Sequence, residues 1–202
     1  TLGSAGISIA DGGNVGIGTS TPNYLFSVEA SGGADIGLHR ADTSISDGDD
    51  LGTIKFTGGD PSGYHLGAQI RAEAAGTWTT DGENKPTEIQ FFTQDGSDSD
   101  TAGSPVVVFD KDGNVGIGLS APTFHSGGGL HISNATAARL HLTDSDAGEA
   151  STDGMYVAQI GTESYVYNFE NDALIFGTNT NERMRILAGG NVCIGGSTDE
   201  GY

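Results

Sequence analysis

The residues with the clearest chemical potential in this 202-residue chain are its acids, which gather in short clusters. Asp and Glu number 27, and the densest clusters lie at residues 47–50, 95–100 and 144–146. Ca²⁺ binds several oxygen ligands, and Asp-rich loops can supply them. None of the clusters has the alternating ligands, the Gly at position six and the Glu at position twelve of an EF-hand. We therefore predict solvated, charged turns and no required cofactor, with Ca²⁺ as the one ion left open.

The side chains that commonly bind transition metals or act as nucleophiles are scattered. The five histidines lack a helical metal-ligand spacing, and they are His39, His65, His125, His131 and His141. Two of them, His39 and His141, occupy equivalent positions in a repeat, which favours a structural role. The only cysteine is Cys193, which excludes an intrachain disulfide and a cysteine-based zinc site. Without a Gly-x-Ser-x-Gly elbow, we predict no catalytic residues, no metal site and no enzymatic activity.

A formal nucleotide-binding motif is present at residues 116–121, which read Gly-Ile-Gly-Leu-Ser-Ala. The dinucleotide fingerprint needs a helix directly after it, because the helix N-terminus binds the pyrophosphate. Here Pro122 and the three glycines at 127–129 follow instead. We therefore predict that the motif belongs to a turn and binds no nucleotide.

Two aromatic residues are candidates for a contact with a receptor or a glycan. Trp78 is the only tryptophan, and Tyr64 lies near it in the sequence. Exposed aromatic rings can stack on the apolar face of a sugar. Large aromatics more often bury their area, so Trp78 packing against its own hairpin or against another copy is the alternative interpretation.

The charge balance limits the partners. Lys and Arg number 8, so the net charge is 8 − 27 = −19. This field repels phosphate backbones and anionic membrane surfaces, so we predict no nucleic-acid binding and no membrane insertion. No apolar run approaches the roughly 20 residues of a membrane-spanning helix. Hydrophobic residues make up 35% of the chain, which predicts a thin core that further copies of the chain would complete.

One phrase occurs three times and organises the chain. Its copies begin at residues 13, 113 and 190, and the residues that define it are Gly13, Asn14, Val15, Ile17, Gly113, Asn114, Val115, Ile117, Gly190, Asn191, Val192 and Ile194. An alternating apolar pair precedes each copy, so each should form a β-hairpin with Val and Ile on one face. Gly and Asn tolerate positive φ, which predicts a primed hairpin turn. In the third copy Cys193 replaces the central Gly, and no Pro follows.

Short alternating runs bounded by Gly, Asp, Asn, Ser and Pro fill the rest of the chain, which predicts an all-β fold. The expected runs include 36–38, 54–56, 66–70, 89–91, 107–109, 130–132, 140–142, 165–169, 174–176 and 184–186. We divide the chain into the end of a preceding module (1–18), a long β module (19–118) and a short β module with a terminal hairpin (119–202). The long module carries an inserted hairpin within 62–86 and an acidic loop at 93–105. This division predicts a segment of a longer, modular chain.

These segments resemble the repeats of bacteriophage tail fibres and tailspikes, of the type found upstream of intramolecular chaperone domains in marine and cyanobacterial phages. The resemblance is carried by "DGGNVGIGTSTP", "DLGTIKFTGGD", "PTEIQFFTQDGS", "ARLHLTDSD" and "NERMRILAGGNVCIGGS", in that order. It implies β-hairpin or β-sandwich-like modules in an elongated homotrimeric fibre on the virion, used for attachment to host cells. The partners it implies are further copies of the chain, other tail or baseplate proteins, and a glycan or protein receptor on the host.

Two other functions remain open at this point. The first is a tailspike module that binds or cleaves carbohydrate, for which Trp78 and Tyr64 would be contact residues. The second is a bacterial surface filament or adhesin built from the same repeats.

Overall fold

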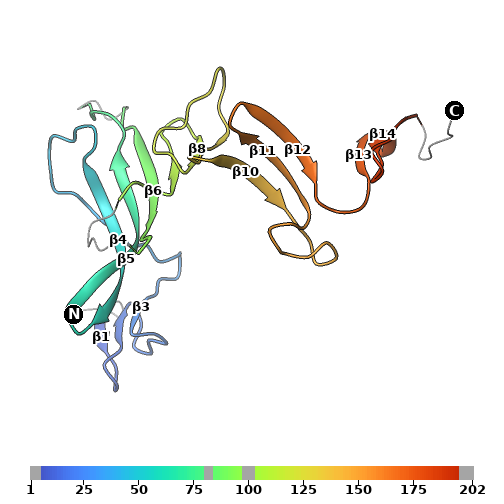
Figure 1. The fold of residues 1–202 in the computed structure, drawn as a ribbon. Coiled ribbons are helices and arrows are strands. Elements are labelled where there is room, and N and C mark those ends of the chain that lie inside the picture. The colour runs from blue at the N-terminus through green and yellow to red at the C-terminus, as the bar shows by residue number, and fades with distance from the viewer. Residues whose placement is uncertain (1–5, 80–83, 97–102, 196–202) are drawn as a thin grey trace.

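The chain folds into strands only, over the residues that the structure describes. The computed structural model describes residues 6–79, 84–96 and 103–195. These form fifteen strands arranged in four sheets, which follow one another along an extended chain (Figure 1). The predicted all-β fold is therefore confirmed. Within the described ranges, no helix is long and apolar enough to cross a membrane.

The largest sheet has six strands in sequence order. It consists of β4 (Asp50–Asp60), β5 (Gly63–Ala74), β6 (Thr87–Thr93), β7 (Val107–Phe109), β8 (Val115–Ile117) and β9 (Leu130–Ile132). All neighbouring strands in it are antiparallel except β8 and β9, which are parallel.

The three smaller sheets have three strands each. The first contains β1 (Ile7–Ile9), β2 (Val15–Ile17) and β3 (Phe26–Val28). The second contains β10 (Ala137–Leu142), β11 (Met155–Ile160) and β12 (Glu163–Asn168). The third contains β13 (Leu174–Thr178), β14 (Asn181–Ile186) and β15 (Val192–Ile194).

The repeated phrase forms a hairpin in all three copies, as predicted. The hairpins are β1–β2, β7–β8 and β14–β15, and their pairing has the same register. Ile9 pairs with Val15, Phe109 with Val115, and Ile186 with Val192 in the three copies. The central residue of the second strand is buried each time, whether it is Gly16, Gly116 or Cys193. Val and Ile of the phrase lie on the opposite face, as the alternation predicts.

The predicted primed turn in this phrase is wrong. In the second copy, the Asp110 N–H donates to the Asn114 carbonyl (2.9 Å) and the Gly113 N–H donates to the Asp110 carbonyl (3.1 Å). The loop thus contains three residues and ends on Gly113 with φ +80°. This is a turn followed by a left-handed Gly, the usual three-residue hairpin loop. The positive φ lies at Gly113 and not at Asn114. The Asn114 side chain instead hydrogen-bonds to Asp110 and Gly129.

A primed turn does occur elsewhere, between β13 and β14. Asn179 and Thr180 have φ of 50° and 62°, and Thr178 pairs with Asn181 on either side of them. Both central residues of a type I′ turn require positive φ. The sequence lacks the usual Asn-Gly signal at this position, so the turn was not predicted.

The first two copies of the phrase are followed by a strand that pairs with them in parallel. The alternation indicates a strand at 130–132, but it indicates neither the strand at 26–28 nor the parallel pairing. β3 pairs with β2 and β9 pairs with β8, in both cases with the chain looping back through a Pro. Residues 26–28 and 130–132 lie after the expected module boundaries at 18/19 and 118/119, but each belongs to the sheet formed by the strands before its boundary. The division into modules itself stays a prediction.

Two expected elements differ in the structure. Residues 36–38 form no strand, since their backbone pairs with no neighbouring strand. The Leu38 side chain lies against Gly52 of β4. The segment 62–86 contains no hairpin of its own, since β4 and β5 form one long hairpin that turns at Pro61 and Ser62. Part of the acidic loop at 93–105 lies outside the described residues. Strand β11 was not expected.

The described sheets are single layers. Every pair of described strands with substantial contact consists of neighbours in one sheet. The sandwich-like packing expected from the resemblance is therefore absent from the described part of this single chain. Few apolar side chains are fully covered, and Val108 is the largest with none of its surface exposed.

Candidate functional site

The most extensive feature of the surface is the apolar face of the six-stranded sheet. Direct pairing places one apolar residue on each strand in a continuous row, which consists of Ile54, Ile70, Phe91, Val107, Ile117 and Ile132. A second row on the same face consists of Ala72, Ile89, Phe109, Val115 and Leu130. The rings of Phe91 and Phe109 meet edge to face at 6.0 Å. Together these rows form what we call the apolar face.

Most of this apolar face is uncovered within one chain, although Leu38 lies against Gly52, the partner of Ala72, at one end. Ile54 is 52% exposed, Leu130 is 51% exposed and Phe109 is 45% exposed. Contiguous exposed apolar surface of this kind is rare on monomeric proteins and marks interaction sites. The geometry therefore fits a surface that another protein chain covers.

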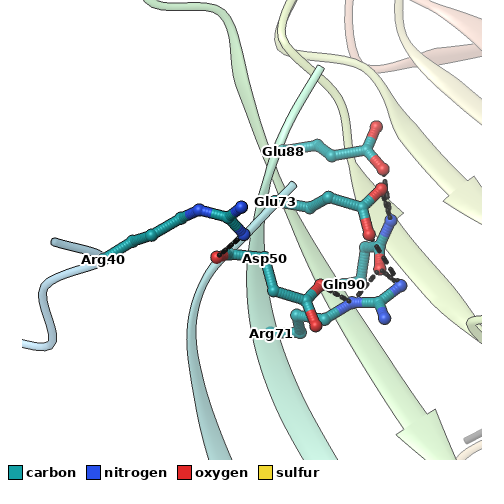
Figure 2. A network of polar contacts seen from close by, with 6 residues as sticks. All are labelled: Arg40, Asp50, Arg71, Glu73, Glu88 and Gln90. Carbon is teal, nitrogen blue, oxygen red and sulfur yellow. Dashed lines mark hydrogen bonds and ion pairs between the residues drawn. The ribbon is translucent and has the colours of Figure 1, made fainter. Parts of the chain in front are cut away.

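The opposite face of the same sheet carries a polar network around Arg71 (Figure 2). The Arg71 guanidinium donates to Gln90 Oε1 through Nε (2.8 Å) and forms an ion pair with Glu73 (2.9 Å). Asp50 lies 3.3 Å from Arg71 Nε. The Gln90 amide donates in turn to Glu73 (3.2 Å) and to Glu88. These residues come together because Arg71 pairs with Gln90 and Glu73 pairs with both Asp50 and Glu88 in the sheet register.

The network is the more completely covered side of the sheet. Gln90 is 3% exposed and Phe92, under the Arg71 guanidinium, is also 3% exposed. Burial raises the pKa of Glu73, the nearby Arg71 lowers it, and the Glu88 and Asp50 carboxylates raise it again, so that its pKa lies above the ordinary value. Arg40 ties the preceding segment to this side by donating to the Asp50 carbonyl (3.3 Å). Each polar side chain of this network has a hydrogen-bond or ion-pair partner within it. Such an arrangement suits a structural role.

The asparagine of the repeated phrase joins the hairpin to the next strand. Asn114 Nδ2 donates to Asp110 (2.9 Å), and its Oδ1 accepts from the Gly129 N–H (3.0 Å) just before β9. In the first copy, Asn14 Nδ2 donates to the Pro22 carbonyl (3.2 Å) in the corresponding loop. The third Asn, Asn191, accepts a turn hydrogen bond from the Leu187 N–H (2.9 Å) through its backbone carbonyl. In the first two copies the asparagine side chain thus joins the hairpin to the segment that follows it, and a purely structural role for the phrase stays a prediction.

The two aromatic candidates lie far apart. Tyr64 is 84% exposed beside the β4–β5 turn, whereas Trp78 follows the other end of β5. Ten residues of extended strand, from 64 to 74, span roughly 33 Å. The Trp78 indole donates to the Pro86 carbonyl (3.2 Å), and Lys85 lies 5.9 Å from its ring. The two side chains thus form no common site, and a glycan contact by either stays a prediction.

A hollow of about 470 Å³ lies beside Trp78. Its lining includes His39, Arg40, Asp42 and Ile45. Arg40 is held there by ion pairs to Asp42 (3.2 Å) and Asp49 (3.0 Å). Arg40 thus faces two carboxylates, so the ion pairs of this hollow hold the segment 40–49 together.

The described histidines hold backbone segments in place. His131 Nδ1 accepts from the Thr123 N–H (3.3 Å), and His141 Nε2 lies 2.7 Å from the Asp153 carbonyl. His141 stands in β10, whereas His39 stands in no strand, so the equivalence predicted for these two positions is wrong. Among the described residues, no group of three or more His, Cys, Asp or Glu side chains could hold a metal ion.

One serine, one histidine and one aspartate do meet, at the β4–β5 turn. The Ser62 hydroxyl lies 2.9 Å from His65 Nε2, and Asp60 Oδ1 lies 3.2 Å from the same nitrogen. A catalytic triad needs the carboxylate on the ring nitrogen opposite the serine. Asp60 instead accepts from the Ser62 N–H (2.7 Å), so the trio stabilises the turn.

The sequence analysis missed a cluster of aromatic side chains on the sheet β10–β12. The Tyr156 ring contacts Tyr165, Tyr167 and Phe169, and Tyr167 also contacts Phe169. The Arg139 guanidinium stacks over Tyr156. The spacing of two between residues 165, 167 and 169 already places these rings on one face of a strand. In the sequence alone, this spacing predicts a strand but does not show which rings of other strands lie beside it.

Comparisons with known proteins give structural similarity alone. No family model matches the chain, and no curated protein matches it. The fold is similar to the carboxy-terminal domain of the bacteriophage T5 L-shaped tail fibre, with 13% identity, a TM-score of 0.43, and coverage of 88% of this chain and 91% of that one. It is also similar to that domain solved with its intramolecular chaperone domain, with 12% identity, a TM-score of 0.41, and coverage of 86% of this chain and 62% of that one. These values are too low to assign a function, so the function is argued from the surfaces of this chain.

Proposed function

We propose that the chain is a structural and adhesive segment of a viral tail fibre, assembled as a homotrimer and used in attachment to host cells. It would lie outside the cell on the virion, joined to other tail or baseplate proteins. In this proposal three parallel chains place their apolar faces toward a common axis. The chain itself catalyses no reaction, and its contribution is a stiff, repeated β-structure that presents receptor-binding surfaces.

The observation that carries the proposal is the amount of exposed surface. The chain exposes 14543 Å² for a mass of 20.6 kDa. A folded monomer of this mass exposes roughly 8,900 Å², so the excess is roughly 5,600 Å². Even a large obligate dimer buries only about 2,500 Å² on each chain. The excess therefore favours two neighbours for each chain, as in a trimer, over one.

The distribution of the exposed surface supports the same arrangement. One apolar row runs across all six strands and the other across five, whereas Gln90 of the polar network is buried within one chain. Copies that meet through the apolar face would bury it without leaving the charged network between them. Joining strands around an axis would also protect sheet edges that otherwise aggregate. The three repeated hairpins then act as regular structural units along the fibre.

The mass of the assembled protein tests the proposal. Sedimentation equilibrium or native mass spectrometry should give three chains for the wild type. Ile54→Glu, on the apolar face, should reduce or abolish the assembly. Lys55→Glu changes the neighbouring residue, which points to the other face, and should leave the mass unchanged. A folded monomeric wild type, or an Ile54→Glu variant that still assembles fully, would refute the proposed arrangement.

A second measurement tests the location. Antibodies raised against the purified chain should label the fibres of virions in negative-stain electron microscopy. Labelling of bacterial surface filaments instead would favour the bacterial adhesin.

A further inference from the structure

The sheet β10–β12 has two chemically different faces. The register places His141, Tyr156 and Tyr167 in one row and Arg139, Ala158 and Tyr165 in the next row of the same face. We call this the aromatic face. The other face carries an aliphatic set, which consists of Leu140, Leu142, Met155, Val157 and Val166. Three polar residues of this face, Gln159, Ser164 and Asn168, hydrogen-bond within the chain.

The aliphatic set is the side suited to further copies of the chain. Leu142 is 50% exposed, Val157 is 46% exposed and Val166 is 53% exposed. These side chains carry no polar group, so burial against another chain leaves nothing unsatisfied. If they turn toward the axis of the fibre, the aromatic face of the same sheet is displayed outward.

The rings of the aromatic face form an ordered platform. Tyr156 and Tyr167 are stacked, with centroids 5.5 Å apart and planes 20° apart. Phe169 meets Tyr167 edge to face at 4.9 Å and Tyr156 at 5.3 Å. Ala158 is only 8% exposed beside them, so the rings are supported from the sheet. Tyr167 remains 46% exposed, which leaves part of its ring available to a ligand.

Polar groups surround the rings. The Arg139 guanidinium lies 5.6 Å from the Tyr156 centroid at one edge, and the Tyr165 hydroxyl donates to Glu163 at the other. His141 must donate through Nε2, because its partner there is the Asp153 carbonyl, which can only accept. The face therefore offers flat apolar rings together with a guanidinium, a carboxylate and phenol hydroxyls.

We propose that the aromatic face binds neutral carbohydrate. A pyranose ring presents C–H groups on its face and hydroxyls around its edge. The C–H groups would stack on Tyr167, and the hydroxyls would reach the polar rim formed by Arg139 and Glu163. A net charge of −19 on each chain repels strongly anionic polymers, which selects neutral sugars. This inference rests on the proposed attachment role, since it names the class of receptor that the fibre segment would contact.

A carbohydrate array tests the inference on the assembled 202-residue protein. The probes are immobilised oligosaccharides of glucose, galactose, mannose and N-acetylglucosamine, with sulfated oligosaccharides as the anionic comparison. Several copies in one assembly raise the apparent affinity, so weak single contacts become measurable. Retention of at least one neutral oligosaccharide above the sulfated set is the expected result.

Variants then locate the contact. Tyr167→Ala should weaken binding by at least about tenfold, as truncation of a central aromatic contact commonly does. Tyr167→Phe keeps the ring and should bind within a few-fold of the wild type. Tyr24→Ala is the matched control, because it removes a tyrosine that is 76% exposed beside a different sheet. Native mass spectrometry of each variant separates loss of the platform from loss of assembly.

The outcomes are distinct. Binding that is lost in Tyr167→Ala and kept in Tyr24→Ala, with both proteins still assembled, supports the inference. No binding to any neutral probe by an assembled wild type overturns the inference and leaves the fibre proposal standing. Equal binding by Tyr167→Ala and the wild type, or equal loss of binding in Tyr24→Ala, also overturns it. A monomeric wild type refutes the fibre proposal itself.

Discussion

Asp110 and Asn114 hold each other across the turn of the second repeated hairpin. The Asp110 carboxylate accepts from the Asn114 backbone N–H (2.8 Å) and from its side-chain amide (2.9 Å). Partial burial raises the pKa of Asp110, but the hydrogen bonds from Asn114 outweigh this effect, so the pKa lies below its ordinary value. The remaining Asn114 oxygen accepts from Gly129, which links the hairpin to β9.

Replacing Asn114 should therefore destabilise both the hairpin and the parallel strand. Asn114 is 8% exposed, and Asn114→Ala leaves the Gly129 N–H without its partner. Loss of such a partner costs about 1–3 kcal/mol. Urea unfolding at fixed chain concentration measures the cost, and hydrogen exchange at residues 129–133 locates it. Asn171→Ala, at an exposed position, is the control; an equal cost in both variants would contradict the assigned role.

The primed turn at Asn179–Thr180 should become more stable with Gly. Thr180 has φ 62°, and a left-handed conformation costs an L-residue about 1–2 kcal/mol. Thr180→Gly creates the preferred Asn-Gly pair and should stabilise the protein by about 1 kcal/mol. Thr162→Gly tests a threonine of the two-residue β11–β12 turn, whose φ is not positive, and should give no gain. A thermal unfolding midpoint that stays unchanged in Thr180→Gly would argue against strain in this turn.

The strands could be predicted because alternation of apolar residues is a local signal. Thirteen of the fifteen described strands lie on runs that the sequence analysis identified, and the two exceptions, β3 and β11, show why the rest was harder. Phe26–Val28 lies outside the expected runs, and it forms a strand because β2 lies beside it in parallel. In contrast, Ile36 and Leu38 alternate but have no strand to pair with. Pairing partners depend on contacts between distant residues, which a local pattern does not contain.

The surfaces were less predictable than the strands. Alternation placed Val115 and Ile117 on one face, but it could not show that a complete apolar row would cross six strands and stay open. The aromatic face depends on the register of β10, β11 and β12, which brings Tyr156 from one strand against Tyr167 from another. The sequence favours Trp78 as a contact residue because it is the only tryptophan. The structure instead groups aromatic rings on the sheet β10–β12.

Glu73 should make stability depend on pH in a definite direction. Its pKa in the folded protein is raised above the ordinary value of 4.5, chiefly by burial. The folded state then binds the proton more tightly than the unfolded state, so this contribution to stability is present below pH 4.5 and is lost as pH rises through the raised pKa. Glu73→Gln cannot ionise, and its stability relative to the wild type should increase with pH across that window.

Asp60→Asn is the control of opposite sign for this experiment. Hydrogen bonds from the Ser62 hydroxyl and N–H lower the pKa of Asp60 below its ordinary value of 3.8. Its contribution is therefore present above pH 3.8 and is lost as pH falls through the lowered pKa. Urea unfolding at fixed chain concentration from pH 3 to pH 7 measures both variants. Parallel curves for Glu73→Gln and the wild type would contradict the raised pKa.

The central residue of the repeated phrase should respond differently in the second and third copies. A Cβ at Gly116 would lie 2.8 Å from the Leu119 carbonyl oxygen, because the loop after β8 folds back over this position. A backbone oxygen cannot move aside as a flexible side chain can, so Gly116→Ala should cost about 1–3 kcal/mol. Cys193 occupies the same position in the third copy and already carries a Cβ at 7% exposure. Cys193→Ala loses one buried sulfur and should cost about 1 kcal/mol or less. Urea unfolding compares the two variants directly; equal costs would show that the loop after β8 adjusts and that Gly116 is not required by close approach.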